Sequence, residues 1–147
     1  MREPTWVRLD KYFTESPSLR AESVPVAEVN EAERSLAVTL PPDYREFIAR
    51  FGGAILGSLP IYGLRRAEPM GRSEGSFVEV TRRFRKQGWP GVDGWVVIST
   101  DGSGNPIGLD AAGAVWISDH DAGSIERLAD DFEEFITGWC LAPRSRG

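Results

Sequence analysis

The sequence predicts an α+β fold, a single domain in which helices pack on an antiparallel β-meander sheet. Three observations predict it: helical apolar stripes precede residue 52, short strand-like runs separated by turns follow residue 94, and a further apolar stripe closes the chain. A length of 147 residues fits one domain. We expect a core over about 24–139, an N-terminal extension over 1–23 and a flexible tail over 140–147.

The first third of the sequence is predicted to form helices. Trp6, Leu9 and Phe13 are spaced for one face of a short helix, and a polar loop is expected over 14–23. Pro25 opens a second helix that ends near Ala37. Its apolar face consists of Val26, Val29, Ala32 and Leu36.

The best-defined helix follows Leu40 and Pro41. Pro42 suits the first helical position, where a missing N–H costs nothing. An apolar stripe at i, i+3, i+4 and i+7 consists of Tyr44, Phe47, Ile48 and Phe51. Gly52 or Gly53 can adopt the left-handed conformation that ends a helix.

The middle of the chain predicts two short strands or one bent strand over 54–64, since strand-forming residues are interrupted there by Gly and Pro. A polar loop is expected over 65–75. Ser76 and Glu79 then have the spacing of a capping box, which starts a helix that Gly88 ends.

The last third of the sequence is predicted to form a β-meander followed by a helix. Strands are expected over 95–99, 106–110 and 114–118, with a tight turn over 101–105. A long helical stripe is expected to follow, made by Ile125, Leu128, Phe132, Phe135, Ile136 and Trp139.

Charge is distributed unevenly. The net charge of −5 argues against a nucleic-acid partner. Between Gln87 and Pro143 the only basic residue is Arg127, whereas ten residues are acidic. These charges either form a solvated face that balances the basic middle of the chain, or form a surface that steers a basic partner.

The sequence also contains few residues that could form a catalytic or metal-binding site, and no cofactor is expected. Asp101 and Gly104 lie in a glycine-rich turn that superficially resembles a calcium loop, but the required sixth and twelfth positions hold Pro106 and Ala112. A hairpin turn explains the glycines better. His120 is the only histidine, and a metal site usually needs further ligands.

Cysteine content and hydropathy indicate the compartment. Cys140 is the only cysteine and cannot form an internal disulfide, so a reducing, cytoplasmic location is expected. No stretch approaches the length of an apolar membrane span, and no membrane partner is expected. Cys140 itself is interpreted as a small buried hydrophobe.

Glu33 is the unusual polar residue, because it lies on or beside the apolar stripe of its helix. A buried carboxylate is costly unless it is paired or hydrogen-bonded. The functional interpretation is a catalytic acid. We favour a structural one, in which the carboxylate accepts backbone N–H bonds at the start of the next helix or pairs with Arg45.

The ordered set of these features resembles the SUKH superfamily, which includes a fungal cell-wall-synthesis regulator and many bacterial immunity proteins. The resemblance covers about 24–137 and includes the final Phe132-Glu-Glu-Phe-Ile136 run. Its signature residues are Glu33, Leu40, Pro41, Tyr44, Phe47, Gly52, Gly53, Asp101 and Gly104.

The resemblance implies a non-enzymatic domain, monomeric or weakly dimeric, that binds another protein, in bacterial members often a toxin and commonly a nuclease. Occlusion of a basic toxin face would use acidic residues, and the candidates are Asp119, Asp121, Asp130, Asp131, Glu133 and Glu134. One alternative is a regulatory interaction module of the cell-wall-regulator type. Another is a small hydrolase that uses Glu33 or His120.

Overall fold

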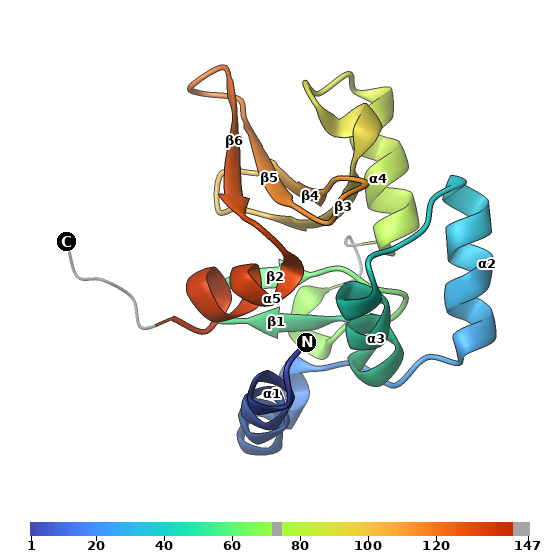
Figure 1. Ribbon diagram of the computed structural model, residues 1–147, viewed down its shortest axis with the longest axis vertical. Helices are drawn as coiled ribbons and strands as arrows, with labels where there is room; N and C mark the ends of the chain where they lie inside the picture. Colours follow the sequence, from blue (N-terminus) through green and yellow to red (C-terminus); the bar gives the residue numbers. More distant parts are fainter. Residues whose placement is uncertain (72–74, 143–147) are drawn as a thin grey trace.

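The computed structural model combines five α-helices with two antiparallel sheets (Figure 1), which confirms the α+β class. It describes residues 1–71 and 75–142. Residues 72–74, in the predicted polar loop, and 143–147, in the predicted tail, lie outside the described residues. The helices are α1 (Glu3–Glu15), α2 (Val26–Leu36), α3 (Pro42–Phe51), α4 (Phe77–Lys86) and α5 (Phe132–Phe135). Shorter helical segments are η1 (Pro17–Leu19), η2 (Glu68–Met70), η3 (Val92–Gly94) and the π-helical η4 (Ile136–Cys140).

The strands form one small and one large sheet. The small sheet pairs β1 (Ala54–Leu56) with β2 (Leu59–Ile61), as the pair of short strands predicted there. The large sheet is a meander with the order β3-β4-β5-β6. Its strands are β3 (Val96–Thr100), β4 (Pro106–Leu109), β5 (Val115–Asp119) and β6 (Ser124–Ala129). Sequential antiparallel pairing leaves β6 at one edge of this sheet.

Helix α3 begins and ends where its sequence predicts. Pro42 occupies the first turn, and Gly52 closes the last turn with a φ of 75° and an N–H···O bond of 2.7 Å to Ile48. The whole predicted stripe is buried. The backbone then folds back so closely that a methyl group on Gly63 would lie 2.1 Å from the carbonyl oxygen of Gly52.

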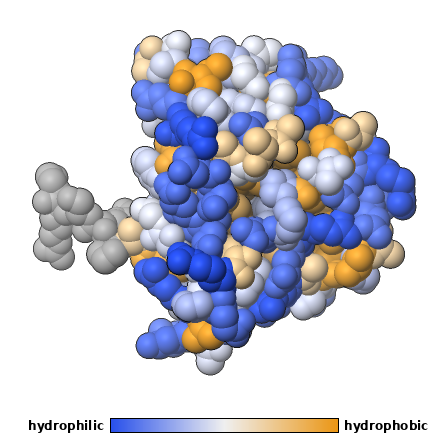
Figure 2. Space-filling view, in the orientation of Figure 1, coloured by the Kyte–Doolittle hydropathy of each residue, from blue (hydrophilic) through white to orange (hydrophobic). Residues whose placement is uncertain are grey.

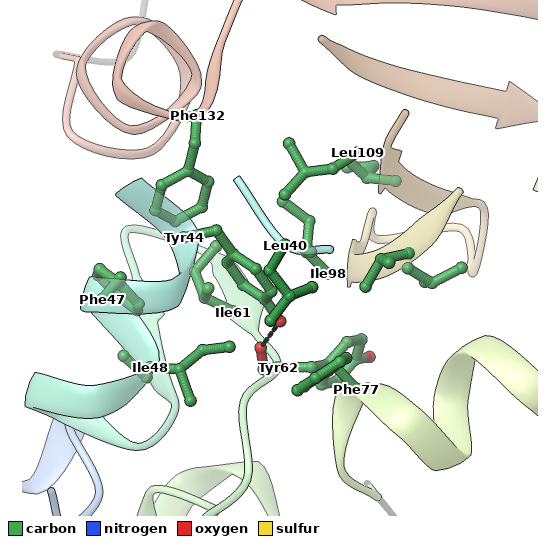
Figure 3. Close-up of a cluster of buried hydrophobic side chains, with 14 of the residues drawn as sticks. Leu40, Tyr44, Phe47, Ile48, Ile61, Tyr62, Phe77, Ile98, Leu109 and Phe132 are labelled. Atoms are coloured by element: carbon green, nitrogen blue, oxygen red, sulfur yellow. Dashed lines mark hydrogen bonds between the residues drawn. The ribbon is translucent and has the colours of Figure 1, made fainter. Parts of the chain in front are cut away.

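The centre of the core lies where α3, the small sheet and α5 meet (Figure 3). The hydroxyl of Tyr44 donates a 2.6 Å hydrogen bond to the carbonyl oxygen of Tyr62. The ring of Phe132 packs edge-on against the rings of Tyr44 and Phe47, with centroid distances of 5.3 and 5.4 Å. These contacts place the start of α5, and therefore the end of β6, directly over α3.

The predicted helical stripe after residue 124 is wrong in its first half and confirmed at Phe132, Phe135 and Ile136, which are helical and buried. Residues 124–129 form β6, and the helix begins only at Phe132, where the carboxylate of Asp131 accepts a 2.8 Å bond from the Glu134 N–H. The three-residue spacing of Ile125 and Leu128 is typical of one face of a helix, but backbone pairing with β5 makes this segment a strand. Trp139, expected in the stripe, is 54% exposed.

The N-terminal segment is part of the packed structure. Helix α1 buries Trp6, Leu9 and Phe13, and the ring of Phe13 lies 4.7 Å from that of Phe51. The helix and η1 together occupy half of the predicted 14–23 loop, so the loop is shorter than predicted. Val26 is also misassigned, because it is 59% exposed rather than part of a buried face.

Candidate partner-binding surface

Glu33 lies between two helices and contacts both connected segments. Its carboxylate accepts a 2.7 Å bond from the Leu40 N–H and forms an ion pair with Arg45, whose guanidinium also donates to Asn30. Both contacts of the structural interpretation are therefore present. The pair joins the end of α2 to the start of α3.

The Asp101 turn satisfies its carboxylate internally. Asp101 accepts bonds of 2.9 Å from the backbone N–H groups of Ser103 and Asn105, and one of 3.0 Å from the Asn105 amide. The other end of the Asn105 side chain accepts a 2.9 Å bond from the His120 N–H. The turn from Asp101 to Asn105 thus holds the β5–β6 turn in place. Within residues 1–71 and 75–142, no three His, Cys, Asp or Glu side chains are grouped to hold a metal ion.

Cys140 is buried, whereas His120 is exposed beside an aromatic ring. The His120 ring is 5.5 Å from the ring of Trp89, beside the β5–β6 turn. Burial raises the pKa of the Cys140 thiol to about 12, so the thiol is protonated at neutral pH. A protonated, buried thiol is a poor nucleophile.

The predicted acidic residues lie at opposite ends of β6 (Figure 1). Asp119 ends β5 and Asp121 lies in the β5–β6 turn, whereas the other four follow β6 at the start of α5. Six strand residues separate the groups by about 20 Å. We call residues 119–134 the acidic edge, because it carries seven carboxylates and one basic side chain, Arg127.

Four of the six predicted carboxylates have structural contacts. Asp131 caps α5, Asp119 accepts a 3.0 Å bond from the Ala122 N–H, and Asp130 pairs with Arg127 at 3.0 Å. Glu133 accepts a 2.6 Å bond from the Thr5 hydroxyl and one of 2.9 Å from the Arg2 N–H. The Thr5 bond, with a smaller contribution from Arg2, lowers the pKa of the Glu133 carboxyl.

Three carboxylates on the acidic edge remain available to a partner. Asp121, Glu126 and Glu134 are exposed, and their side chains form no hydrogen bond or ion pair with the described part of the chain. Glu126 was not predicted as a candidate. The apolar neighbours of Glu126 have the spacing of a helix, so the sequence did not indicate that Glu126 lies on an exposed edge strand.

Two apolar side chains complete the acidic edge. Ile125 is 43% exposed near its turn end. Trp139 lies near its other end, where the indole N–H donates a 2.9 Å bond to the carbonyl oxygen of Leu128. Exposed aromatic side chains held in one orientation are frequent anchors of protein interfaces. Sequence reasoning missed Trp139 because it was assigned to the core.

The rest of the visible surface is mostly polar. Figure 2 shows hydrophilic residues over most of the face seen in Figure 1, with hydrophobic groups in small, separate areas. A protein that used this face would therefore meet charge and hydrogen-bonding groups around isolated apolar contacts. The described helices include none long and apolar enough to cross a membrane.

Comparison with protein families places most of the described elements within one family model. The sequence model of the SMI1/KNR4 family (SUKH-1) matches residues 24–138. This range begins after α1 and includes Glu33, the α3 helix, the whole meander and the acidic edge. No curated protein matches the chain.

Proposed function

The chain belongs to the SMI1/KNR4 family (SUKH-1), and from this premise we propose that it is a non-enzymatic domain that binds a basic protein through the acidic edge. We further propose that the partner is a toxin domain, which the chain neutralises in the cell that produces both. The match to the family model supports the assignment to the SUKH superfamily. The excess of carboxylates on the acidic edge supports a partner with a basic surface.

The observation that carries the proposal is the spacing of the exposed carboxylates along β6. Asp121 and Glu134 flank a strand about 20 Å long, and Glu126 lies within it. A small ligand cannot contact both ends. A protein interface of ordinary size, which buries about 800 Å² on each partner, can cover the whole acidic edge.

Neutralisation would work by covering the toxin's active face. A nuclease carries a basic surface for its substrate, and the acidic edge would compete for that surface. The carboxylates would accelerate association, while Trp139 and Ile125 would supply apolar contacts that slow dissociation. No bond has to be made or broken in either protein.

The test is a growth assay with candidate toxin domains taken from the genes adjacent to the gene of this chain. We expect co-expression of the chain to restore growth, and reversal of Asp121, Glu126 and Glu134 to lysine to abolish protection. Growth arrest that persists with the unaltered chain would overturn the toxin assignment. Restored growth with the triple variant would overturn the assignment of the surface.

Purification from the native cell separates the two SUKH roles. A captured basic toxin domain supports immunity. A captured non-toxin protein whose binding requires the acidic edge would instead assign the chain as a regulatory interaction module.

A further inference from the structure

A second polar surface differs in charge from the acidic edge. A cleft of about 970 Å³ lies between η1, the segment that follows β2 and the start of α4. Among the residues that the structure describes, its lining includes four arginines, Arg20, Arg65, Arg66 and Arg83, and two carboxylates, Glu22 and Glu79. A third carboxylate, Glu28, pairs with Arg65 from beside the cleft, so the excess among these residues is one formal positive charge, four minus three, in a chain whose net charge is −5.

Two of these arginines are held in fixed positions. Arg20 donates to the carbonyl oxygens of Arg50 and Ala21 at 2.7 and 3.0 Å. Arg65 forms two bonds of 2.8 Å to the carboxylate of Glu28, one from each terminal nitrogen. Cationic side chains that are already ordered lose less conformational entropy when a ligand binds.

Arg83 provides a charge that is available to a ligand. Its side chain is exposed and lies over the Phe84 ring, with 5.1 Å between the guanidinium carbon and the ring centroid. With the described residues it forms no hydrogen bond or ion pair. Gly75 and Ser76 bring the N-terminal end of the ten-residue helix α4 to the same cleft, where the Glu79 carboxylate accepts a bond from the Ser76 N–H as part of the capping box.

From these contacts we propose that the cleft binds an acidic peptide segment of a protein partner. Guanidinium groups bind carboxylates through paired hydrogen bonds, and the cleft is at the upper end of the usual size of ligand pockets, about 300–1,000 Å³. Glu22 and Glu79 repel any anion, but they repel a polyphosphate chain more strongly than a peptide whose carboxylates are spaced apart, and Glu22 can accept bonds from the N–H groups of a peptide. This surface is independent of the acidic edge.

The experiment measures fluorescence anisotropy of a short labelled peptide that alternates Glu with Gly, added to the full chain at low salt. We expect saturable binding, with Arg83→Glu weakening it about tenfold or more. The control is Lys11→Glu, which changes the net charge by the same amount at an exposed position of α1 outside the cleft. This variant is expected to bind the peptide almost as tightly as the unaltered chain. The same peptide with Gln in place of Glu should not bind.

Three results would overturn the proposal. The first is equal loss of binding in Arg83→Glu and Lys11→Glu, which would show a non-specific charge effect. The second is tighter binding of a labelled single-stranded oligonucleotide, which would change the class of ligand. The third is self-association in sedimentation velocity that Arg83→Glu abolishes, which would make a second copy of the chain the occupant. Reversal of Asp121, Glu126 and Glu134 should leave peptide binding intact, so this test is separate from that of the acidic edge.

Discussion

The Glu33 carboxylate accepts a 2.7 Å hydrogen bond from the backbone N–H of Leu40, seven residues further along the chain. The bond spans the turn between α2 and α3, and the ion pair with Arg45 fixes the second oxygen of the same carboxylate. One side chain thus sets the position of α3, whose aromatic residues fill the centre of the core.

Replacing Glu33 with alanine should therefore destabilise the fold. The change removes a charge-assisted hydrogen bond and leaves the Arg45 guanidinium without its carboxylate partner, so we expect a loss of about 1–3 kcal/mol in the free energy of unfolding. Urea denaturation measures it. The matched control is Glu31→Ala on the same helix, which breaks only an exposed ion pair with Arg34 and should cost less than about 0.5 kcal/mol. Equal midpoints for the two variants would contradict the anchoring role.

Gly63→Ala should destabilise the protein strongly for a steric reason. The added methyl group would lie 2.1 Å from the Gly52 carbonyl oxygen and 3.2 Å from the Gly53 nitrogen, and backbone atoms cannot rotate away. We expect a loss of about 3 kcal/mol or more in thermal or urea unfolding. Gly102→Ala is the control, because no atom lies within 4 Å of its added methyl group. A Gly63 variant as stable as the Gly102 variant would show that the two segments do not approach so closely.

Asp110 should make folding stability depend on pH. Partial burial acts to raise the pKa of its carboxyl, but bonds from the Trp116 indole and from backbone N–H groups outweigh burial and hold the pKa below the ordinary value of 3.8. A carboxyl with a lowered pKa in the folded state contributes stability above the unfolded pKa. That contribution is lost as the pH falls through the folded value.

The measurement compares the unfolding free energy at about pH 6 and pH 3 for the unaltered chain and for Asp110→Asn. We expect the variant to lose less stability on acidification, since its side chain does not titrate. Asp93→Asn changes an exposed carboxylate in the first turn of η3 and should lose as much stability as the unaltered chain. If Asp110→Asn were equally acid-sensitive, the Trp116 and backbone bonds would not control the titration.

Trp139 should contribute to partner binding and little to stability. Its side chain is 54% exposed and its one hydrogen bond is to the Leu128 carbonyl at the end of the acidic edge. Trp139→Ala should therefore weaken binding of the basic partner by about 2 kcal/mol, mostly through faster dissociation, while the unfolding free energy changes much less. Surface plasmon resonance with the captured partner gives the rates. Unchanged dissociation would remove Trp139 from the interface.

The sequence predicts best those elements whose signals are local. Helix α3 has a proline at its start, a complete apolar stripe and a glycine at its end, and its predicted and observed bounds agree. The Ser76–Glu79 capping box likewise predicts the start of α4. The β6 strand could not be predicted in this way, because its conformation depends on pairing with the edge of β5.

The same limit applies to the candidate surface. Charge counting correctly indicates that the C-terminal third is acidic, but it cannot separate carboxylates with structural contacts from those that face solvent. Asp131 caps a helix and Glu133 binds α1, whereas Glu126 is exposed on a strand that the sequence pattern presents as a helix. Only the three-dimensional structure shows that the exposed carboxylates lie along the edge strand β6.

The most direct test of the acidic edge is quantitative co-purification from the native cell, with captured proteins measured by mass spectrometry. One variant reverses Asp121, Glu126, Asp130 and Glu134 to lysine, and the control reverses Asp10, Glu15, Glu31 and Glu46. Each variant changes the net charge by eight, from −5 to +3. We predict that a basic partner captured by the unaltered chain is lost from the first variant and kept by the control. Equal capture by both variants would contradict the account.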